Sequence, residues 1–409
     1  MKQSIFTIAR ISQKATFLLF VMMVCVLITP ACTSDLEDLE STNKLTETVS
    51  SVSSNITKEE ALNLANKVLQ KNYTKGTVSD MPTFDYVTRD PLTKSVEGTD
   101  TLAYILNYPD NGGFVIVSKT RKVFPILAYS DEGSFNISNE NAKKGFIDKI
   151  GYYVDSSSND DLYDIDTDFK VGCYVVNPMI QTTLSQYDPW NKYVVKEHPG
   201  CPAGCLAIAT ALAMTHSKYN IYYHNSTFYL KSIVNAINKK QTGKTNVRAR
   251  IENGEGPYVP TYTYEQAVDS MAKLIYWIGK DLGTEYSIQE SSATFDKVYP
   301  LCYSLKYTIP FRYKAFNMDE IVQYIKDNYI IIMCGTDNRH YPAPASHAWV
   351  ADACSYCVDP VDSSIIYNTL IHCDWGWGGY CNGYFSSKVF SVDEYNFVGT
   401  AYIPIKKEY

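Results

Sequence analysis

The first apolar stretch of the chain is a single run from Ala15 to Ile28, in which only Thr16 is polar and which basic residues precede. This run is shorter than the roughly 20 apolar residues that a membrane-spanning helix needs. Its length and its basic flank are typical of the central part of a signal peptide. We therefore expect residues 1–31 to direct export of the chain.

The apolar run ends in Thr29-Pro-Ala-Cys32, where a small residue directly precedes a cysteine. This ending resembles a bacterial lipobox, although the family of such signals usually has leucine where Thr29 stands. We expect Cys32 to be lipidated and to become the new N-terminus; the alternative is an ordinary cleaved signal that leaves an incidental cysteine. Residues 32–55 are rich in Ser and Thr and have too little apolar surface to repay ordering, so they are predicted to form a flexible tether.

A helical pattern of apolar positions starts after Thr57, where Thr57-Lys-Glu-Glu60 has the spacing of a capping box. Three strand-like runs follow at 102–108, 113–118 and 124–129, and Pro-Asp-Asn-Gly-Gly between the first two predicts a hairpin turn. Residues 56–154 are therefore expected to form a small α+β domain. The polar, acidic stretch 155–169 is predicted to be a linker.

Composition places the chemistry in the C-terminal part of the chain. Of 409 residues, 45% are hydrophobic and 20% are charged, which allows a sizeable core and two to three domains. A net charge of -7 excludes a general nucleic-acid partner, because no basic field covers the chain. All six histidines and nine of the eleven cysteines lie in residues 170–409, so catalysis is expected there.

The first candidate catalytic residue is Cys205, in Cys201-Pro-Ala-Gly-Cys205, which leads into the apolar, small-residue run 206–214. The proline and the glycine are turn residues and place Cys205 at the N-terminus of a buried helix. There the helix dipole is expected to lower the pKa of the thiol, and free N–H groups can stabilise an oxyanion. The alternative is an inert buried cysteine that begins a core helix.

The second candidate is His347, which lies 142 residues after Cys205 at the start of an apolar, strand-like run. A lone histidine in such a run is more often structural than catalytic. However, a cysteine followed by a histidine at this separation is what a papain-like enzyme requires. The imidazole would take the proton of the thiol and later give it to the leaving amine.

The third candidate site is the Asp374-Trp-Gly-Trp-Gly-Gly379 segment. The glycines allow close approach of the backbone, and the tryptophans supply a large aromatic wall. Asp374 is expected to accept a hydrogen bond from the imidazole and so fix its tautomer. Trp375 is expected to shield that bond from water.

Together the three motifs, in this order and spacing, resemble those of the streptopain family of bacterial papain-fold cysteine proteases. The resemblance implies an α+β, papain-like fold over residues 170–409, with a helical subdomain that carries the cysteine and an antiparallel sheet subdomain that carries the histidine. It also implies that residues 56–154 are an inhibitory propeptide and that maturation cuts the 155–169 linker.

The same resemblance assigns further residues near the substrate. Gln186 stands in Gln-Tyr-Asp-Pro-Trp-Asn191, which is similar to the family segment whose Gln contributes an oxyanion-hole donor. Ser292 lies in a Ser-Ser-Ala stretch similar to a family segment near the substrate. Ser346 stands where the family has a small residue whose backbone contacts substrate. The resemblance implies protein or peptide substrates and the chain's own propeptide as a partner in cis.

The chain departs from the family pattern at Asp374, where Asn is usual, and at Leu212, where Gln is common. These departures keep two alternatives to a cysteine endopeptidase open. One is a non-catalytic surface binding protein on a protease scaffold. The other is a Cys-His-Asp amidase or transferase that acts on cell-wall or isopeptide bonds.

The remaining cysteines raise the question of a metal site. Cys354, Cys357, Cys373 and Cys381 have a tolerable but poor spacing for zinc, so we expect no metal and no cofactor. Disulfides are favoured in an exported protein, but their pairing is open. Cys201 is the rival nucleophile and ranks below Cys205. The expected location is the outer membrane or cell surface, with the lipid on Cys32 as the only membrane contact and with release of the mature enzyme as a further option.

Overall fold

The computed structural model describes 53–70, 81–89, 100–136, 140–157, 162–163, 165, 174–217, 220–242, 260–337, 345–358, 361, 366–389, 391–392, 395–396 and 398–407. The predicted signal peptide, Cys32 and most of the tether and of the 155–169 linker lie outside these residues. Within the described part of the chain, no helix has both the length and the apolar character needed to cross a membrane.

The described residues of the N-terminal region form two α-helices and four antiparallel strands. They are α2 (Lys58–Val68), β1 (Thr83–Thr88), β2 (Thr101–Asn107), β3 (Phe114–Ser118), β4 (Ile126–Ser130) and α3 (Glu140–Asp155). The three predicted strands are β2, β3 and β4, whose side chains are almost all buried. The sequence pattern did not predict β1, a half-exposed edge strand, or α3, whose two internal glycines are unfavourable in a helix.

The predicted capping box at the start of α2 is confirmed. The Thr57 hydroxyl accepts a hydrogen bond from the Glu60 backbone N–H at 3.2 Å, and the Glu60 carboxylate accepts one from the Thr57 N–H at 2.7 Å. Glu60 also pairs with Arg121, whose guanidinium lies 2.6 Å away and whose side chain is only 4% exposed. One side chain therefore caps α2 and ties the helix to the loop after β3.

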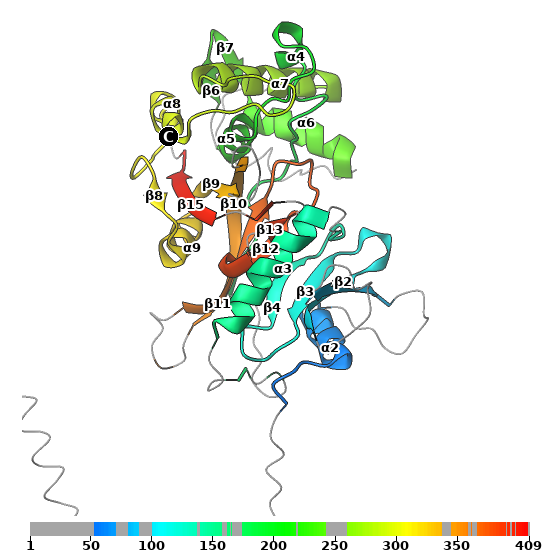
Figure 1. Ribbon diagram of the computed structural model, residues 1–409. Coiled ribbons are helices and arrows are strands. Elements are labelled where there is room, and N and C mark those ends of the chain that lie inside the picture. The colour runs from blue at the N-terminus through cyan, green and yellow to red at the C-terminus, as the bar shows by residue number, and fades with distance from the viewer. Residues whose placement is uncertain are drawn as a thin grey trace, which may run out of the picture. The chain divides into compact units, whose positions relative to one another are not determined.

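The C-terminal region starts with a helical part and ends with a sheet part, as Figure 1 shows from top to bottom. The helical part contains α4 (Val194–Glu197), α5 (Cys205–Thr215), the hairpin β6 (Ile221–Tyr223) and β7 (Ser226–Phe228), α6 (Leu230–Thr242), α7 (Tyr264–Asp281) and α8 (Val298–Ser304). In α5 every residue after Cys205 is buried, as its apolar, small-residue sequence predicts.

The sheet part packs against α5 and α9. Its elements are β5 (Tyr174–Val176), β8 (Lys314–Ala315), α9 (Met318–Lys326), β9 (Ile330–Asp337), β10 (Ala345–Val358), β11 (Ile366–Asp374), β12 (Gly383–Ser386), β13 (Ser391–Val392), β14 (Tyr395–Asn396) and β15 (Val398–Ile405). His347 lies on β10, the longest strand, which pairs antiparallel with β9 and β11. The predicted α+β class, with the cysteine on a helix and the histidine on an antiparallel strand, is confirmed.

The strands of the two regions form one continuous sheet. Its order is β1-β2-β3-β4-β12-β11-β10-β9-β15-β8, so β4 of the N-terminal region pairs with β12 of the C-terminal region (Figure 1). At this junction Tyr129 lies opposite Tyr384, and their rings stack with centroids 4.8 Å apart. The described residues accordingly belong to one compact unit, Ser53–Tyr409.

Candidate active site

Helix α5 begins at Cys205 because Gly204 precedes it in a conformation that favours glycine. Gly204 is the N-cap and has φ +90°. A Cβ at this position would have ordinary contacts of 3.4–3.6 Å with Thr284 and Ser291, so the backbone conformation and not a lack of space favours glycine here. The turn therefore places Cys205 in the first turn of α5, where backbone N–H groups have no helical partner, as the sequence predicts.

Three hydrogen bonds hold the loop that leads into α5. The Ala203 N–H donates to the Gln186 carbonyl oxygen at 2.8 Å, and the Asn191 side chain donates to the Cys201 carbonyl at 3.0 Å. On the other side, the buried hydroxyl of Ser291 donates to the carbonyl oxygen of Pro202 at 2.8 Å. These bonds fix the position of the thiol relative to two segments that are distant in sequence.

The electrostatics at Cys205 differ from the prediction. Burial raises the pKa of the thiol, although the backbone N–H groups of Ala348, Leu206 and Cys205 itself lower it, and the carboxylate of Glu290 raises it further. The N–H groups at the start of α5 lower the pKa of the thiol, as expected, but by less than removal of the thiolate from water raises it. In the full chain Cys205 is therefore a thiol at neutral pH.

His347 lies near the start of β10 and is 6% exposed. Its Nε2 lies 2.8 Å from the carbonyl oxygen of Trp375, so Nε2 carries the proton and donates it. This tautomer leaves Nδ1 as the nitrogen that can accept a proton. Burial lowers the pKa of the imidazole to about 4, against a smaller opposite effect of the Trp375 carbonyl.

Asp374 and Trp375 adopt a different arrangement from the expected one. The Asp374 carboxylate accepts a hydrogen bond from the Gly376 N–H at 3.0 Å, and the group that accepts from the imidazole is the main-chain carbonyl of Trp375. Burial raises the pKa of Asp374 to about 6. Asp374 is the last residue of β11, and this turn directs its side chain to the loop backbone.

A different tryptophan from the predicted one contacts the imidazole. The ring of Trp377 lies 5.0 Å from that of His347, whereas Trp375 is fully buried and donates from Nε1 to the Cys381 carbonyl at 3.0 Å. The glycine between them is required, because Gly376 has φ +72° and a Cβ there would lie 2.9 Å from the Ile208 side chain of α5. The loop thus brings the second tryptophan of the motif, not the first, over the histidine.

A buried ion pair lies next to this loop. His372 Nδ1 lies 2.6 Å from a carboxylate oxygen of Asp352, whose other oxygen accepts a hydrogen bond from the Ile180 N–H at 2.8 Å. Burial lowers the pKa of His372, but the carboxylate of Asp352, together with those of Asp374 and Asp131, raises it more, so the net shift is upward. This pair joins β10 to β11 and gives His372 a structural role.

Cys205 and His347 line one open pocket of about 190 Å³. The residues around it, here called the Cys205–His347 pocket, are Cys205, Leu206, Glu290, Ser291, Ser292, Ala293, Phe295, Cys334, Gly335, Thr336, Ser346, His347 and Ala348. Both predicted substrate-binding serines are among them. Gln186, Asp374 and Trp375 do not line the pocket. The backbone of Gln186 is nevertheless hydrogen-bonded to Ala203, which lies two residues before Cys205.

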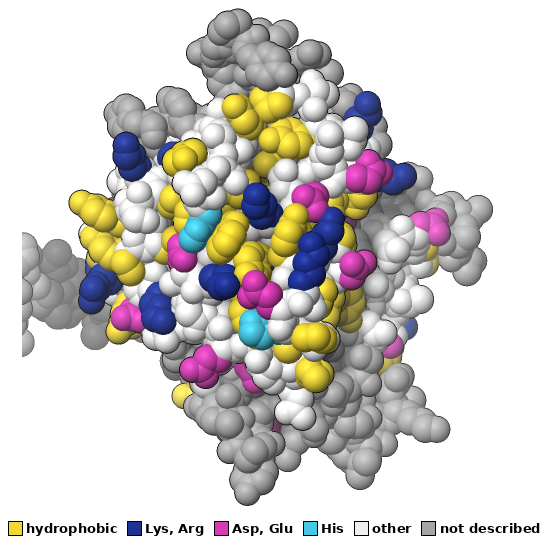
Figure 2. Space-filling view, turned by 90° about the horizontal axis from the view of Figure 1, so that it is seen from above, with side chains coloured by type: hydrophobic (Ala, Val, Ile, Leu, Met, Phe, Trp, Pro, Cys, Tyr) yellow, Lys and Arg dark blue, Asp and Glu magenta, His cyan; other side chains and the backbone are white. Residues whose placement is uncertain are grey.

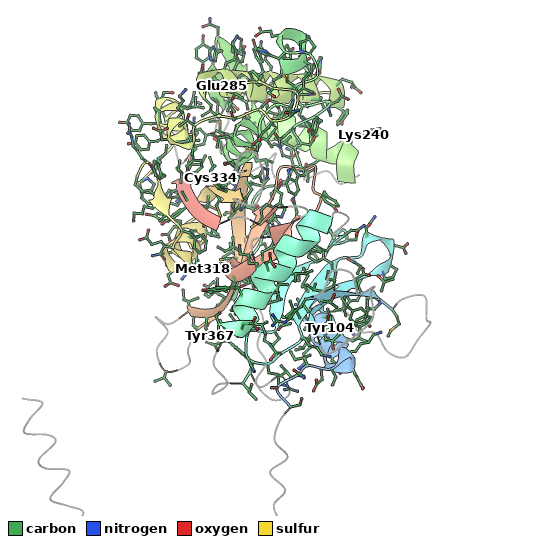
Figure 3. The ribbon with its side chains drawn as sticks, in the orientation of Figure 1. Tyr104, Lys240, Glu285, Met318, Cys334 and Tyr367 are labelled. Carbon is green, nitrogen blue, oxygen red and sulfur yellow. The ribbon has the colours of Figure 1, made fainter. Side chains whose placement is uncertain are left out.

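Two residues of this pocket, Glu290 and Cys334, are not predicted from the sequence. Cys334 lies on β9 directly opposite Ala348 of β10, and Figure 3 shows it where the helical part meets the sheet. Glu290 directly precedes the Ser-Ser-Ala stretch that contains Ser292, which is the one sequence signal that could have pointed to it, whereas no motif singles out Cys334. Figure 2 shows the face formed by the helical part, on which acidic and basic side chains are interspersed among hydrophobic ones.

The cysteines of the described residues are mostly thiols. Cys357 is disulfide-bonded, and the free cysteines are Cys201, Cys205, Cys302, Cys334, Cys354, Cys373 and Cys381. Three of the four candidate zinc ligands are therefore buried thiols, and the described residues contain no group of three or more ligands that could hold a metal ion. Cys201 is buried, with its sulfur directed to the Pro199 carbonyl, and does not line the Cys205–His347 pocket.

Two family models match the chain, one for each region. Residues 184–385 match the peptidase C10 family, and residues 53–149 match the Spi protease inhibitor family. The first match contains both Cys205 and His347. The second contains α2 and β1 to β4, the elements that extend the sheet.

Individual proteins are also similar to the chain. Streptopain of Streptococcus pyogenes is 24% identical over 304 residues, which cover 69% of this chain and 73% of the relative. The solved structure of prointerpain A from Prevotella intermedia matches 80% of this chain and 99% of its own, with 17% identity and a TM-score of 0.48. The structure of active interpain A of the same organism matches 56% of this chain and 94% of its own, with 17% identity and a TM-score of 0.38.

Proposed function

The chain belongs to the peptidase C10 family of cysteine peptidases, the streptopain family, and we propose that it is a zymogen of an exported endopeptidase in which Cys205 and His347 carry the reaction. The observation that supports this most is the pocket that both side chains line, on a chain that also contains an inhibitor domain. The family and the pocket together favour an enzyme over a binding protein on a protease scaffold.

In the proposed mechanism, Nδ1 of His347 takes the proton of the Cys205 thiol and the sulfur attacks the carbonyl carbon of the peptide bond. The protonated imidazole then gives this proton to the leaving amine, and an acyl-enzyme remains on the sulfur. Water, deprotonated by the same nitrogen, hydrolyses the thioester and restores both side chains. The hydrogen bond from Nε2 to the Trp375 carbonyl supports this mechanism, because it leaves Nδ1 available for the proton.

The negative oxygen of each tetrahedral intermediate needs hydrogen-bond donors at a fixed position. The Cys205 N–H, at the start of α5, and the side chain of Gln186 are the proposed donors. The bond between the Gln186 carbonyl and Ala203 supports this proposal, because it holds the glutamine beside the nucleophile. Ser292 and Ser346 are proposed to contact the substrate backbone, and Asp374 is proposed to fix the loop that orients His347.

The inhibitor domain is proposed to restrain the enzyme until the 155–169 linker is cut. The pairing of β4 with β12 supports a restraint that acts on the sheet, because β12 also pairs with β11, whose end leads into the Trp375 loop. The shifts at Cys205 and His347 are consistent with a restrained state, since a neutral thiol beside a neutral imidazole is a weak nucleophile.

The test of this function compares two cysteine variants. Cys205→Ala should abolish both cleavage of a protein substrate and labelling by a thiol-directed epoxide, while Cys201→Ala should keep both. Cleavage by Cys205→Ala at the rate of the unaltered chain would exclude the assignment. Casein and a cell-wall peptide, offered in parallel, would separate an endopeptidase from an amidase or transferase that acts on cell-wall bonds.

Export and anchoring are a separate part of the proposal, and the apolar run 15–28 followed by Cys32 supports them. Cells that make the chain should incorporate labelled fatty acid into it, and Cys32→Ser should remove the label without preventing signal cleavage. A label that stays in Cys32→Ser would show that the lipid site lies elsewhere. Equal amounts of the unaltered chain and of Cys32→Ser in the culture medium would show that Cys32 does not anchor the protein to the cell.

A further inference from the structure

Among the described residues that line the Cys205–His347 pocket there is one carboxylate and no basic side chain other than the imidazole of His347. The carboxylate belongs to Glu290, and the other lining residues are small, hydroxyl-bearing or apolar. A single uncompensated charge in a substrate pocket is a strong determinant of which side chains can bind. The role of Glu290 is not part of the reaction described above.

The position of Glu290 is fixed by its neighbours. The Ser292 N–H donates to the Glu285 carbonyl at 3.1 Å, and the Glu285 N–H donates to the Ser292 carbonyl at 2.8 Å, which closes the loop 285–292. Within this loop the buried Ser291 is anchored to Pro202, three residues before the nucleophile. The backbone at residue 290 is therefore held beside the N-terminus of α5.

The side chain of Glu290 is exposed and has no ion-pair partner among the described residues. Its negative charge nevertheless acts on the nucleophile, because it raises the pKa of the Cys205 thiol. The carboxylate thus lies close enough to destabilise a thiolate on Cys205 and, among the described residues, has no ion pair that would prevent it from binding a ligand. A positive group bound there would offset its unfavourable effect on the thiolate.

We propose that Glu290 makes the pocket select a substrate with a lysine or arginine side chain next to the scissile bond. The walls fit such a side chain, because Phe295 and Leu206 offer apolar surface to its stem. Its cationic head would then reach Glu290, and an arginine would bind the carboxylate with two hydrogen bonds. This inference rests on the proposed function, whose substrate class it specifies.

The test uses pairs of fluorogenic peptides that differ at one residue near the scissile bond, where one peptide has arginine and the other has citrulline. Citrulline has nearly the same shape as arginine but no charge. The ratio of kcat/KM for the arginine peptide to that for the citrulline peptide should fall about 10-fold in Glu290→Gln, as expected for a lost charge-assisted hydrogen bond. The peptides are offered to the full chain after its rate of hydrolysis has become constant.

Glu285→Gln is the matched control, since Glu285 is an exposed carboxylate of the same loop that does not line the pocket. This variant should keep the ratio of the unaltered chain. Glu290→Lys should invert the preference and favour a peptide with glutamate at the same position. Figure 3 labels Glu285, which lies in the helical part above Cys334.

Two outcomes would overturn the inference about Glu290. One is a ratio of the two kcat/KM values that stays the same in Glu290→Gln. The other is an equal fall of kcat/KM for the arginine and the citrulline peptide, which would indicate a general effect on the reaction. Failure of the proposed function would look different, because no peptide would then be cleaved and the epoxide would not label Cys205.

Discussion

The imidazole of His347 is hydrogen-bonded to the main chain of Trp375, with 2.8 Å between Nε2 and the carbonyl oxygen. A backbone carbonyl cannot be removed by substitution and does not change its charge with pH. The tautomer of His347 is therefore set by the path of the Trp375 loop and not by a titratable side chain. Anything that moves this loop is expected to change catalysis through the orientation of the imidazole.

The protonation state of Cys205 and His347, the proposed catalytic pair, predicts a slow reaction of Cys205 in the unprocessed chain. The pKa of His347 is lowered to about 4 and that of Cys205 is raised, so both groups are neutral at pH 7. The rate of alkylation by iodoacetamide should be low at pH 7 and should increase up to a pH above the ordinary thiol pKa. Mass spectrometry of the precursor alone gives this rate, and a plateau already at pH 6 would contradict the prediction.

Replacement of Asp374 by Asn should stabilise the protein at neutral pH. The folded-state pKa of about 6 lies above the ordinary 3.8, so this carboxyl favours folding while it is protonated and loses that contribution as the pH rises through 6. We expect Asp374→Asn to raise the free energy of unfolding by about 2 kcal/mol at pH 7.5 and to change it little at pH 4. Urea unfolding of the full chain at both pH values measures this.

Asp352→Asn is the contrasting variant for this experiment. Asp352 is ion-paired with His372 and also accepts the Ile180 N–H, so its loss should lower the free energy of unfolding at pH 7.5. The same gain in stability in both variants would show that removal of any buried charge stabilises the protein, whatever its partners. No gain in Asp374→Asn would show that the carboxylate is not penalised by its burial.

Gly383→Ala should weaken the hold of the inhibitor domain on the sheet. A Cβ at Gly383 would lie 2.7 Å from the Tyr129 carbonyl oxygen and 3.0 Å from the Ser130 Cβ, both of which belong to β4. Such a clash costs about 1–3 kcal/mol, and the proposed cut in the 155–169 linker would remove β4 from the enzyme. Processing of the full chain should therefore be faster by about 10-fold, as followed by gel electrophoresis over time.

Gly151→Ala is the matched control for the glycine at 383. It lies in α3, and its Cβ would have ordinary contacts of 3.6 Å with Arg89 and Leu102, all within the N-terminal region. Its rate of processing should equal that of the unaltered chain or be lower, since alanine favours a helix. Equal rates in both variants would show that the contact between β4 and β12 does not limit activation.

Two substitutions at the start of α2 should destabilise the N-terminal region by different amounts. Thr57→Ala removes half of the capping box and should cost about 1 kcal/mol. Glu60→Ala removes the other half and also leaves the buried guanidinium of Arg121 without its carboxylate, so it should cost about 2–3 kcal/mol. The midpoints of urea unfolding distinguish the two, and equal losses would show that the ion pair contributes nothing.

The sequence alone predicted the local features of the chain well. The capping box at Thr57, the three strands of the N-terminal region and the position of Cys205 at the start of α5 depend on residues within one or two turns of each other. The spacing of apolar residues sets the period of a helix or strand, and turn residues set its ends. The order of the cysteine, histidine and Trp-Gly motifs also identified the family.

The tertiary structure decided which of these residues meet and how they are charged. The pairing of Tyr129 with Tyr384, and the contact of His347 with the ring of Trp377 and the main-chain carbonyl of Trp375, join segments whose separation in sequence carries no signal. The helix N-terminus predicted a low pKa for Cys205, but burial raises it. Desolvation depends on every group that surrounds an atom, and those groups come from the whole fold, whereas a capping box or a period needs only neighbours along the chain.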